Sequence, residues 1–382
     1  MKSGLLLLAL VVVSAIAFAR FADVPLEDPL WWITNQTPPT VTIDGPAGPL
    51  RGPVEARLSV APAGRTRVVS VRVDDQVRSG ADGRIALDTA SLGDGPHRVE
   101  VVVHDTSRRQ NLSSAVWSFV SDNTPPRLEV NLDPAEGPVE GHTVSLRVRA
   151  DERVQDVRGA INGRSVRLQS DPSGGWWFLY GFAPDGPETG LTVQLAATDA
   201  AGNTAQFDQA WPLRHTTFPE DDVDLRPSDA ELQAHLDEDR RLAELYRQDS
   251  GPRLWDGAFR VPVQGAVTTA FGTHRSYEYH PGMDFAAPLG APVAAPADGV
   301  VVFVGSMPAR GNIVILDHGA GVFTTYAHLQ RAEVSPGTAV KPGQVIARVG
   351  STGYSTGPHL HWELWIDGAN VDPQEWTRRA FP

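Results

Sequence analysis

The sequence predicts a mainly β protein in which two β-sandwiches are followed by a linker helix and a C-terminal β-rich domain. The first indication is a repeat: Thr37-Pro-Pro and Thr124-Pro-Pro stand 87 residues apart, and each opens a stretch of short alternating apolar runs. The second is a turn signal about every ten positions, which is typical of β-sandwiches. The third is an acidic segment with a partly periodic apolar stripe, which separates these stretches from a final region punctuated by glycine and proline.

An apolar stretch of fifteen residues, Leu5 to Ala19, lies near the start of the chain, and Ser14 is its only polar member. As a helix it would span about 22 Å, less than the roughly 30 Å hydrocarbon layer of a membrane. Because small residues within it offer cleavage sites, we expect residues 1–19 to be an export signal peptide. An uncleaved membrane anchor is the alternative, since Lys2 is the only basic residue ahead of the stretch. We therefore expect an exported protein, in the periplasm, in the cell envelope, secreted, or anchored at the inner membrane.

Two sandwich domains are expected over residues 37–122 and 123–215, after a leader linker over residues 20–36. Because the chain has no cysteine, each must be stable through its apolar core without disulfides. The stretch Asp199-Ala-Ala-Gly-Asn-Thr resembles the late-strand turn of bacterial immunoglobulin-like domains, and this resemblance implies immunoglobulin-like sandwiches. A spacer role is favoured for both, with a wall- or partner-binding surface as the alternative. The expected strands include Val54–Val60, Val68–Val73, His97–Val103, Thr143–Val148 and Leu191–Ala197.

Residues 216–254 are expected to form an acidic helical linker. Within it, residues 219–249 hold eleven acidic and four basic side chains, a net charge of −7 out of the chain's −13. The domain that follows, residues 255–382, holds eight basic and ten acidic residues and shows no basic patch. Since proteins bind nucleic acids through clustered Lys and Arg, nucleic acid is not an expected partner. We expect the acidity to belong mostly to a solvated linker helix.

Five residues of the C-terminal domain have the types and spacing of a catalytic zinc site, namely His280, Asp284, His328, His359 and His361. Imidazole nitrogen and carboxylate oxygen are the ligands that such a site prefers, and it uses three protein ligands while leaving one position for water. Two of these histidines flank a single leucine in an apolar run that predicts a strand. Because alternate residues of a strand share a face, both imidazoles should point into one site, where one can bind metal while its neighbour moves protons.

The wider sequence around these five residues forms a nearly continuous series of motifs. They are Phe271-Gly272, His280-x-x-x-Asp284-Phe-Ala-Ala-Pro, Ala295-Pro-Ala-Asp-Gly299-Val-Val, Gly311-Asn312, Tyr326-Ala-His328-Leu329, Val340-Lys-Pro-Gly-Gln-Val-Ile346 and Gly350-Ser-Thr-Gly-Tyr-Ser-Thr-Gly-Pro-His-Leu-His361. Over roughly residues 260–376 this series resembles the lysostaphin-type (LytM-like) peptidoglycan endopeptidases. The resemblance implies a compact antiparallel β-domain with zinc in a narrow groove. The strands expected in this domain are Gly299–Val304, Asn312–Leu316, Phe323–Leu329, Gln344–Val349 and His359–Trp365.

The resemblance also implies a role for each of the five residues. It implies that His280, Asp284 and His361 bind Zn²⁺, and that His328 and His359 activate the water and stabilise the developing oxyanion without binding metal. General chemistry agrees, because a bound zinc lowers the pKa of its water and polarises the substrate carbonyl. A nearby imidazole can then take up the proton and return it.

Two further residues leave alternatives open. Asn312 matches a family asparagine that fills the fourth zinc position in latent members, but the role of an ordinary turn asparagine is equally supported. Together with the acidic helix it could keep the groove covered. Glu363 shares the strand face of the two neighbouring histidines. It could accept an imidazole N–H, but an ordinary exposed strand glutamate is the favoured interpretation.

Other residues near the site carry weaker signals. A family tyrosine that assists catalysis matches either Tyr277 or Tyr279, because the sequence between them is irregular. His274 and His318 lie close in sequence, but no spacing makes them ligands. They are more simply interpreted as structural histidines.

The predicted function is zinc-dependent hydrolysis of the stem-peptide cross-links of bacterial peptidoglycan, in cell-wall remodelling or lysis. One alternative is a non-catalytic LytM-like activator of a cell-wall amidase. Degenerate regulators of this kind lose ligands or catalytic histidines, whereas all five positions are present here. Another alternative is a secreted protease that acts on glycine-rich proteins. Zinc content separates the enzyme from the regulator, and the substrate separates the two enzymes.

Overall fold

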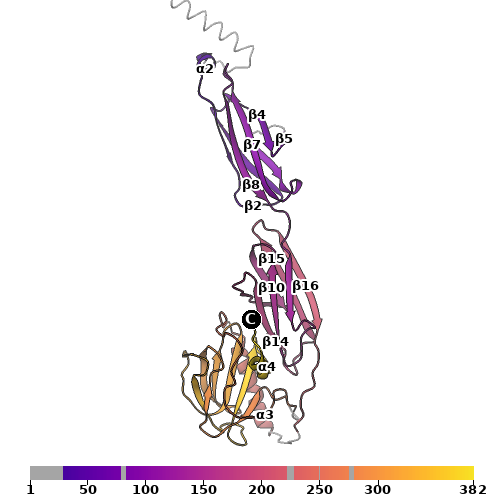
Figure 1. The fold of residues 1–382 in the computed structure, drawn as a ribbon, viewed down its shortest axis with the longest axis vertical. Coiled ribbons are helices and arrows are strands. Elements are labelled where there is room, and N and C mark those ends of the chain that lie inside the picture. The colour runs from indigo at the N-terminus through magenta and orange to yellow at the C-terminus, as the bar shows by residue number, and fades with distance from the viewer. Residues whose placement is uncertain (1–28, 79–82, 222–227, 249, 275–278) are drawn as a thin grey trace, which may run out of the picture. The chain divides into compact units, whose positions relative to one another are not determined.

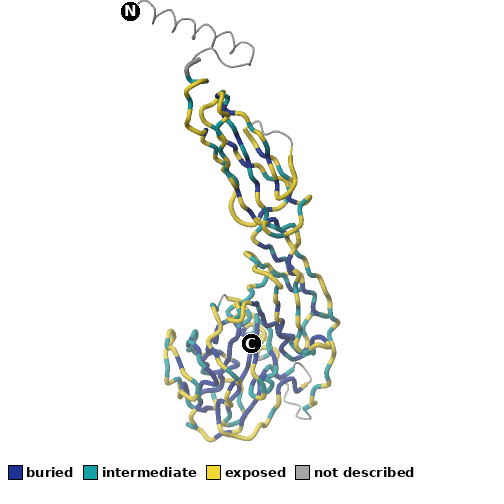
Figure 2. The backbone as a smooth tube through the Cα atoms, turned by 45° about the horizontal axis from the view of Figure 1, so that its top comes forward, coloured by how far each residue is buried: buried dark blue, intermediate teal, exposed yellow. Residues whose placement is uncertain are grey.

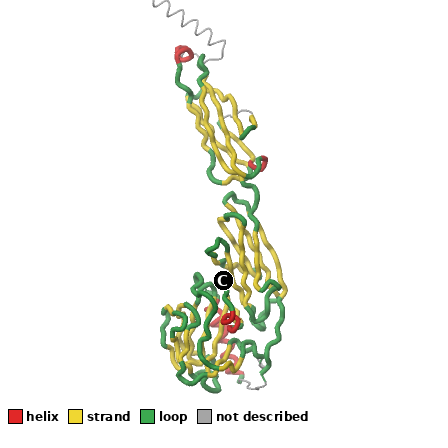
Figure 3. The backbone as a smooth tube through the Cα atoms, in the orientation of Figure 1, coloured by secondary structure: helices red, strands yellow, loops and turns green. Residues whose placement is uncertain are grey.

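The computed structural model describes residues 29–78, 83–221, 228–248, 250–274 and 279–382, and most of its regular structure is strand (Figure 1, Figure 3). Antiparallel sheets dominate, which confirms the mainly β class. The apolar stretch Leu5–Ala19, for which a signal peptide or a membrane anchor is expected, lies outside the described residues. Within those residues, no helix has the length and apolar character needed to cross a membrane.

The chain divides into two compact units. The first comprises the described residues up to Pro126 together with the segments Glu152–Asp156 and Thr198–Ala205. The second comprises Arg127–Asp151, Val157–Ala197 and Gln206–Pro382. It therefore holds most of the second sandwich, the acidic segment and the C-terminal domain. All five residues of the expected zinc site lie in this second unit.

The first unit contains a sandwich of two sheets, with strand orders β1-β3-β6 and β2-β8-β7-β4-β5. The sheets share one apolar core, in which Ala56 from the first sheet and Val101 from the second are completely buried. The alternating burial along β7 is the period-two pattern of a strand with one face in the core. The elements are α2 (Pro29–Thr34), β1 (Thr40–Asp44), β2 (Pro49–Leu50), β3 (Pro53–Ala61), β4 (Thr66–Val73), β5 (Gln76–Arg78), β6 (Arg84–Asp88), the 3₁₀ turn η1 (Thr89–Ser91), β7 (Gly95–Asp105) and β8 (Leu112–Ser121).

The second sandwich also has two sheets, with strand orders β13-β14-β10-β9 and β12-β11-β15-β16. Leu146 from one sheet and Val193 from the other are completely buried in its core. A shared core between two sheets confirms the sandwich architecture in both cases, whereas the immunoglobulin-like identity stays a prediction. The strands are β9 (Leu128–Asp133), β10 (Thr143–Ala150), β11 (Val154–Ile161), β12 (Arg164–Val166), β13 (Gln169–Ser170), β14 (Trp176–Gly181), β15 (Gly190–Asp199) and β16 (Thr204–Pro212).

The C-terminal domain is built on a ten-stranded sheet whose main path runs β17-β18-β25-β22-β21-β20-β23. Off this path, β24 pairs with β19 and β22, and β26 pairs with β25. Every strand expected in this domain from the sequence is present. The elements are β17 (Ala266–Thr269), β18 (Met283–Ala286), β19 (Pro292–Ala294), β20 (Gly299–Met307), β21 (Gly311–Asp317), β22 (Val322–Ala332), β23 (Ala339–Val340), β24 (Val345–Val349), β25 (His359–Ile366), β26 (Ala369–Val371) and α4 (Pro373–Arg378).

The central strands of this sheet are buried on both faces, and buried residues are dense throughout the domain (Figure 2). On β22, Val322 and Tyr326 belong to a large apolar core on one face. Phe323 and Ala327 belong to a smaller core on the other face. A strand that is buried on both sides reads as a nearly continuous apolar run, which explains why β22 shows little alternation in its sequence.

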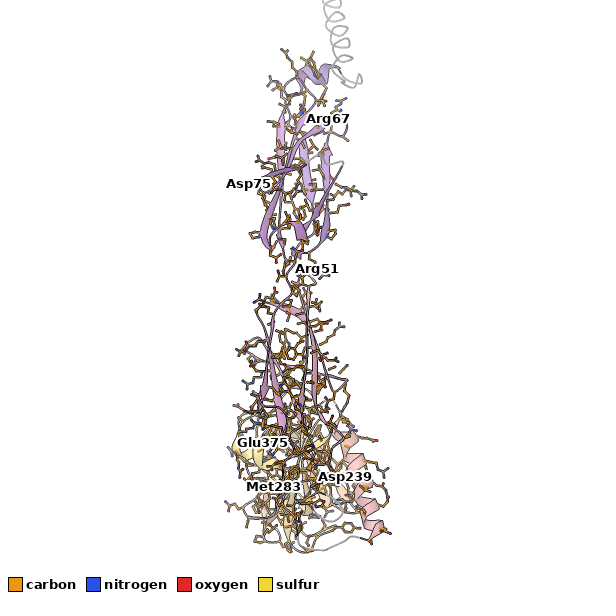
Figure 4. The ribbon with its side chains drawn as sticks, turned by 90° about the vertical axis from the view of Figure 1, so that its right-hand side faces the viewer. Arg51, Arg67, Asp75, Asp239, Met283 and Glu375 are labelled. Atoms are coloured by element: carbon orange, nitrogen blue, oxygen red, sulfur yellow. The ribbon has the colours of Figure 1, made fainter. Side chains whose placement is uncertain are left out.

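The helix α3 (Asp229–Tyr246) closes the smaller core. Its Leu242 and Tyr246 are buried, the Tyr246 ring stacks on Trp365 with centroids 4.6 Å apart, and its hydroxyl hydrogen-bonds to Thr325. Figure 4 shows α3 beside the strands, with Asp239 labelled. The expectation of a solvated acidic helix is therefore wrong for one side of α3, because apolar residues spaced along it dock on the sheet.

The second sandwich packs directly on the C-terminal domain within the second unit. Trp177 on β14 lies edge-on to Trp255 with centroids 6.2 Å apart, in the large core. Trp376 on α4 donates its indole N–H to the Thr143 hydroxyl at 2.9 Å, and the Thr143 backbone N–H donates to Glu375 at 3.1 Å. Because these contacts are apolar or hydrogen-bonded and largely buried, this sandwich supports the C-terminal domain and is not merely tethered to it.

Candidate metal centre

Two neighbouring strands bring the expected ligands together. β18 and β25 are antiparallel, and their register places Asp284 directly opposite His361. Opposed side chains on one face have Cβ atoms about 4.5–5.5 Å apart, within reach of a shared ion. His280 lies just ahead of β18, where its backbone N–H donates to Thr273 and its carbonyl accepts from Gly272. This pair of hydrogen bonds joins His280 to the turn that follows β17.

The three side chains are buried and their inner atoms are close together. His361 Nδ1 lies 2.8 Å from Asp284 Oδ1, and His280 Nε2 lies 3.2 Å from Asp284 Oδ2. His280 Nε2 and His361 Nδ1 are 3.1 Å apart. With metal–ligand bonds of about 2.0–2.1 Å, the ligand atoms of a tetrahedral zinc would be about 3.3 Å apart. The spacing therefore fits three corners of a zinc tetrahedron.

The hydrogen bonds of the outer ring nitrogens of His280 and His361 determine the tautomer of each ring. His280 Nδ1 lies 3.1 Å from the Ala270 carbonyl, and His361 Nε2 lies 2.9 Å from a carboxylate oxygen of Glu363. Both partners are acceptors, so both outer nitrogens carry protons. In the neutral rings the inner nitrogens then present lone pairs to each other and to Asp284. Three acceptors this close repel unless a positive charge lies among them, either a bound metal ion or a proton on the inner nitrogen of His361.

The hydrogen bonds and charges of the site favour a positive charge between His280, Asp284 and His361. Burial opposes the charge on His361, but the hydrogen bonds and negative charges of Asp284 and Glu363 outweigh it and raise the pKa of His361 to about 9. Burial likewise opposes the charge on Asp284, yet hydrogen bonds and charge from His280 and His361 hold the pKa of this carboxyl far below its usual range. Asp284 is therefore ionised and available as a ligand.

His328 and His359 lie beside the expected ligands with a different orientation. Their rings are 4.7 Å apart, and His359 Nε2 is 3.9 Å from Asp284 Oδ1. Each Nδ1 lies 2.8 Å from a backbone carbonyl, that of Thr352 for His328 and that of Gly357 for His359, so each Nδ1 donates. In the neutral ring Nε2 is then an acceptor. Burial and the charges of the two neighbouring histidines lower the pKa of His328 to about 3, so its ring is neutral near neutral pH.

The backbone of His328 has an uncommon conformation. Its φ of 57° is in the left-handed region, which is costly for a side chain other than glycine, asparagine or aspartate. The strain coincides with irregularities in the pairing of β22 with β21 and with β24. The His328 N–H donates to the Arg310 carbonyl at 2.8 Å, which holds this conformation in place. Such a bulge turns a side chain away from the regular direction of its strand, here toward the site.

The favoured interpretation of Glu363 as an exposed strand residue is wrong, because its side chain is completely buried. It accepts from His361, from the Arg310 Nε at 2.8 Å and from the Trp365 indole at 2.8 Å. The alternative, an acceptor for an imidazole N–H, is the one that the structure supports. Arg310, which is 2% exposed, was not singled out in the sequence. It stands in a short turn without a motif, so no local signal marks it.

Asn312 and Tyr279 have other contacts. The Asn312 amide donates to the carbonyls of Leu329 at 3.1 Å and Gln330 at 3.3 Å, which favours the structural interpretation of this residue. The Tyr279 ring packs against Phe218 and His274, at centroid distances of 5.5 and 4.9 Å. Its expected contribution to catalysis stays a prediction. Tyr277 lies outside the described residues.

His318 is a structural histidine. It is completely buried, its Nδ1 donates to the Asp298 carbonyl at 2.7 Å, and its Nε2 lies 2.8 Å from the Thr324 hydroxyl. Its ring also packs against Phe259, with centroids 4.8 Å apart. These contacts satisfy both nitrogens of the neutral ring. Burial lowers the pKa of His318 to about 4, although the Asp298 carbonyl and charge oppose the shift.

Comparisons with known proteins identify a peptidase family in the part of the chain that holds the site. Residues 278–373, which include all five expected site residues, match the model of Peptidase family M23. The DD-carboxypeptidase/endopeptidase Mpg of Neisseria meningitidis is 50% identical over 124 residues, 31% of this chain and 29% of that protein. The peptidoglycan DD-endopeptidase ShyA of Vibrio cholerae is 37% identical over 150 residues, 37% of this chain and 34% of that protein.

Among solved structures, the catalytic domain of lysostaphin from Staphylococcus simulans is 32% identical, with a TM-score of 0.29. The match covers 30% of this chain and 92% of that chain. The curated relatives match over about a third of their own length, as Mpg and ShyA do at 29% and 34%. The family match, at residues 278–373, lies within the C-terminal domain.

We predict that His318 makes folding stability depend on pH. Between about pH 4 and pH 6.5 the ring is neutral in the folded protein and charged in the unfolded chain, so the unfolded chain binds the additional proton. The free energy of unfolding should therefore fall as the pH decreases through this window, by up to about 3 kcal/mol from this group. Urea unfolding at about pH 7 and about pH 4.5 should show a larger stability difference between the wild type and His318→Gln at the higher pH. A difference that does not change with pH would contradict this assignment.

Proposed function

We propose that this chain, whose C-terminal domain belongs to peptidase family M23, is a zinc-dependent endopeptidase that hydrolyses peptide cross-links of bacterial peptidoglycan. The observation that carries the proposal is the cluster of His280 Nε2, His361 Nδ1 and an Asp284 carboxylate, 2.8 to 3.2 Å apart, with two further histidines beside it. Relatives in Vibrio cholerae are named as peptidoglycan DD-endopeptidases, which supports the substrate class.

The residues of the site fit zinc, and each has a role in the proposed reaction. His280, Asp284 and His361 would hold the ion, which supplies a Lewis acid and a water with a lowered pKa. His328 and His359 are the proton-transfer residues. Each has its Nδ1–H fixed on a backbone carbonyl and an Nε2 that accepts. One takes the proton of the attacking water at its Nε2 and returns it to the leaving amine. To stabilise the oxygen that becomes negative, the other ring must carry a proton at its Nε2, because its Nδ1–H is held by a backbone carbonyl.

The preserved set of five residues disfavours the regulatory alternative. A non-catalytic activator needs no proton-transfer histidines, yet both are present here, with geometry that orients their acceptor nitrogens. Peptidoglycan lies outside the cytoplasm, so the substrate also implies an extracytoplasmic location. This agrees with an export signal at residues 1–19, which is proposed from the sequence only.

We predict that Asp284→Ala lowers the zinc content of the purified protein well below one ion per chain and abolishes hydrolysis. The reason is that the variant removes the only carboxylate among the three inner ligand atoms. His274→Ala is the matched control, since it removes a histidine of the same region that lies outside the ligand set. Zinc is measured by atomic emission after dialysis. An Asp284→Ala protein that still binds a full equivalent would exclude Asp284 as a ligand.

His359→Ala is expected to separate metal binding from the reaction. The variant should retain close to one zinc per chain, because the imidazole of His359 faces Asp284 at 3.9 Å and is not part of the ligand cluster. Its kcat should fall by about 10²-fold or more, the range for loss of a proton-transfer group. If this variant lost its zinc instead, the roles of the two histidines on β25 would have to be exchanged.

The substrate itself is tested with purified cell-wall sacculi. The zinc-loaded protein is expected to convert cross-linked muropeptide dimers to monomers, without shortening the glycan strands and without releasing free stem peptides. The products are resolved by reversed-phase chromatography and mass spectrometry. Release of stem peptides from the sugar would indicate an amidase. Unchanged muropeptides would favour the regulator or the protease of glycine-rich proteins.

A further inference from the structure

Arg310 is a buried positive charge at the centre of a group of carboxylates. It lies in the turn between β20 and β21 and is 2% exposed. Its guanidinium bonds to Glu363 at 2.8 Å and to Asp239 at 2.7 Å, and it lies 3.5 Å from Glu238. A buried charge is tolerated only where partners of opposite charge surround it, so these contacts fix the position of the guanidinium. Two of the three carboxylates belong to α3.

The helix also holds the backbone of this turn. Glu238, which is 5% exposed, accepts the backbone N–H of Ala309 at 2.6 Å and that of Arg310 at 3.1 Å. A carboxylate that accepts two N–H groups forms two strong, charge-assisted hydrogen bonds and so fixes the backbone of the turn. An amide in its place would present a donor to one of the two N–H groups and would lose that bond.

From this turn, separate contacts lead to two histidines of the metal centre. The Arg310 side chain holds Glu363, and Glu363 accepts the outer N–H of His361 at 2.9 Å. The Arg310 carbonyl accepts the N–H of His328, the residue with the strained backbone. The turn also touches the loop before β25, since the Ala309 carbonyl accepts from Tyr354 at 2.7 Å.

A second route joins α3 to Glu363. The Trp365 indole donates to the other Glu363 oxygen, and its ring stacks on Tyr246 at the end of α3. Alternate residues of β25 place His361, Glu363 and Trp365 on one face of the sheet. α3 covers the Trp365 end of this row, and the metal centre lies at the His361 end. The helix is therefore placed to support the centre from the side.

We infer that α3 contributes to the metal centre. Its Glu238 and Asp239 position His361 and His328 through their contacts with Arg310. This inference rests on the proposed function and deepens it. A carboxylate that accepts the outer N–H of a ligand histidine fixes its tautomer and orientation and makes it a better ligand. Glu363 is that carboxylate, and α3 determines where it lies. Glu238, Asp239 and Arg310 are positioning residues, since none of them is among the inner atoms of the site.

The test compares Glu238→Gln with Asp237→Asn in the full-length protein. Asp237 is the matched control, because it is the preceding residue of the same helix, is exposed and pairs with the exposed Arg240. Zinc affinity is measured by competition with a chromogenic chelator, and the Co²⁺-substituted proteins are compared by visible absorption. The kcat and KM for muropeptide dimers and the melting temperature are measured for each variant as well. Glu238→Gln should weaken zinc binding by about 10-fold or more. It should also alter the Co²⁺ spectrum and lower kcat with little change in KM, while Asp237→Asn leaves all of these unchanged.

Unchanged zinc affinity, Co²⁺ spectrum and kcat in Glu238→Gln, with a lower melting temperature alone, would overturn the inference and leave α3 a purely structural helix. If Glu238→Gln fails to fold, Asp239→Asn is measured in the same way, since it removes a half-exposed partner of Arg310. Zinc affinity and the Co²⁺ spectrum need no substrate. A wild type that binds zinc but cleaves no cross-link would therefore defeat the proposed function, while the metal measurements would still decide the inference.

Discussion

The buried guanidinium of Arg310 is the interaction on which the arrangement of the second unit depends. A charge removed from water must be surrounded by partners, and here three carboxylates come from two places in the chain: Glu238 and Asp239 on α3, and Glu363 on β25. Satisfying Arg310 therefore forces the acidic segment, the β20–β21 turn and a ligand-bearing strand into one arrangement. The metal centre is built at the edge of this arrangement.

The sheet contributes the second constraint. The register of β18 against β25 sets Asp284 opposite His361, so a one-residue slip would send one of the two ligands to the opposite face. Apolar cores on both faces of the central strands resist such a slip, because it would expose their buried residues. Both constraints act on His361, through the register and through Glu363. This places the histidine between a carboxylate that faces the metal position and a carboxylate that supports it from behind.

Charge has two distinct uses in the acidic segment. Asp229, Asp237 and Glu244 lie on the exposed side of α3, where they face solvent. Glu238 faces inward and binds two backbone N–H groups, and neighbouring Asp239 reaches the same guanidinium. The net charge of the segment does not reveal this difference, since it counts inward and outward carboxylates alike.

The sequence by itself determined the strands and which residues meet at the candidate site, and it predicted the chemistry of that site. Thr-Pro-Pro repeats and alternating apolar runs predicted the strands of both sandwiches, and the spacing of His359 and His361 was sufficient to place both on one face, because strand geometry is local. The tertiary structure decided what depends on distant contacts. The burial of Glu363, the role of Arg310, the left-handed backbone at His328 and the docking of α3 could not be predicted. Their partners lie 53 to 79 residues away in examples such as Arg310 with Glu363 and Tyr246 with Thr325, and only packing brings them together. A glutamate on a strand looks the same in sequence whether it faces water or a guanidinium, and the energy that distinguishes the two exists only after the chain has folded.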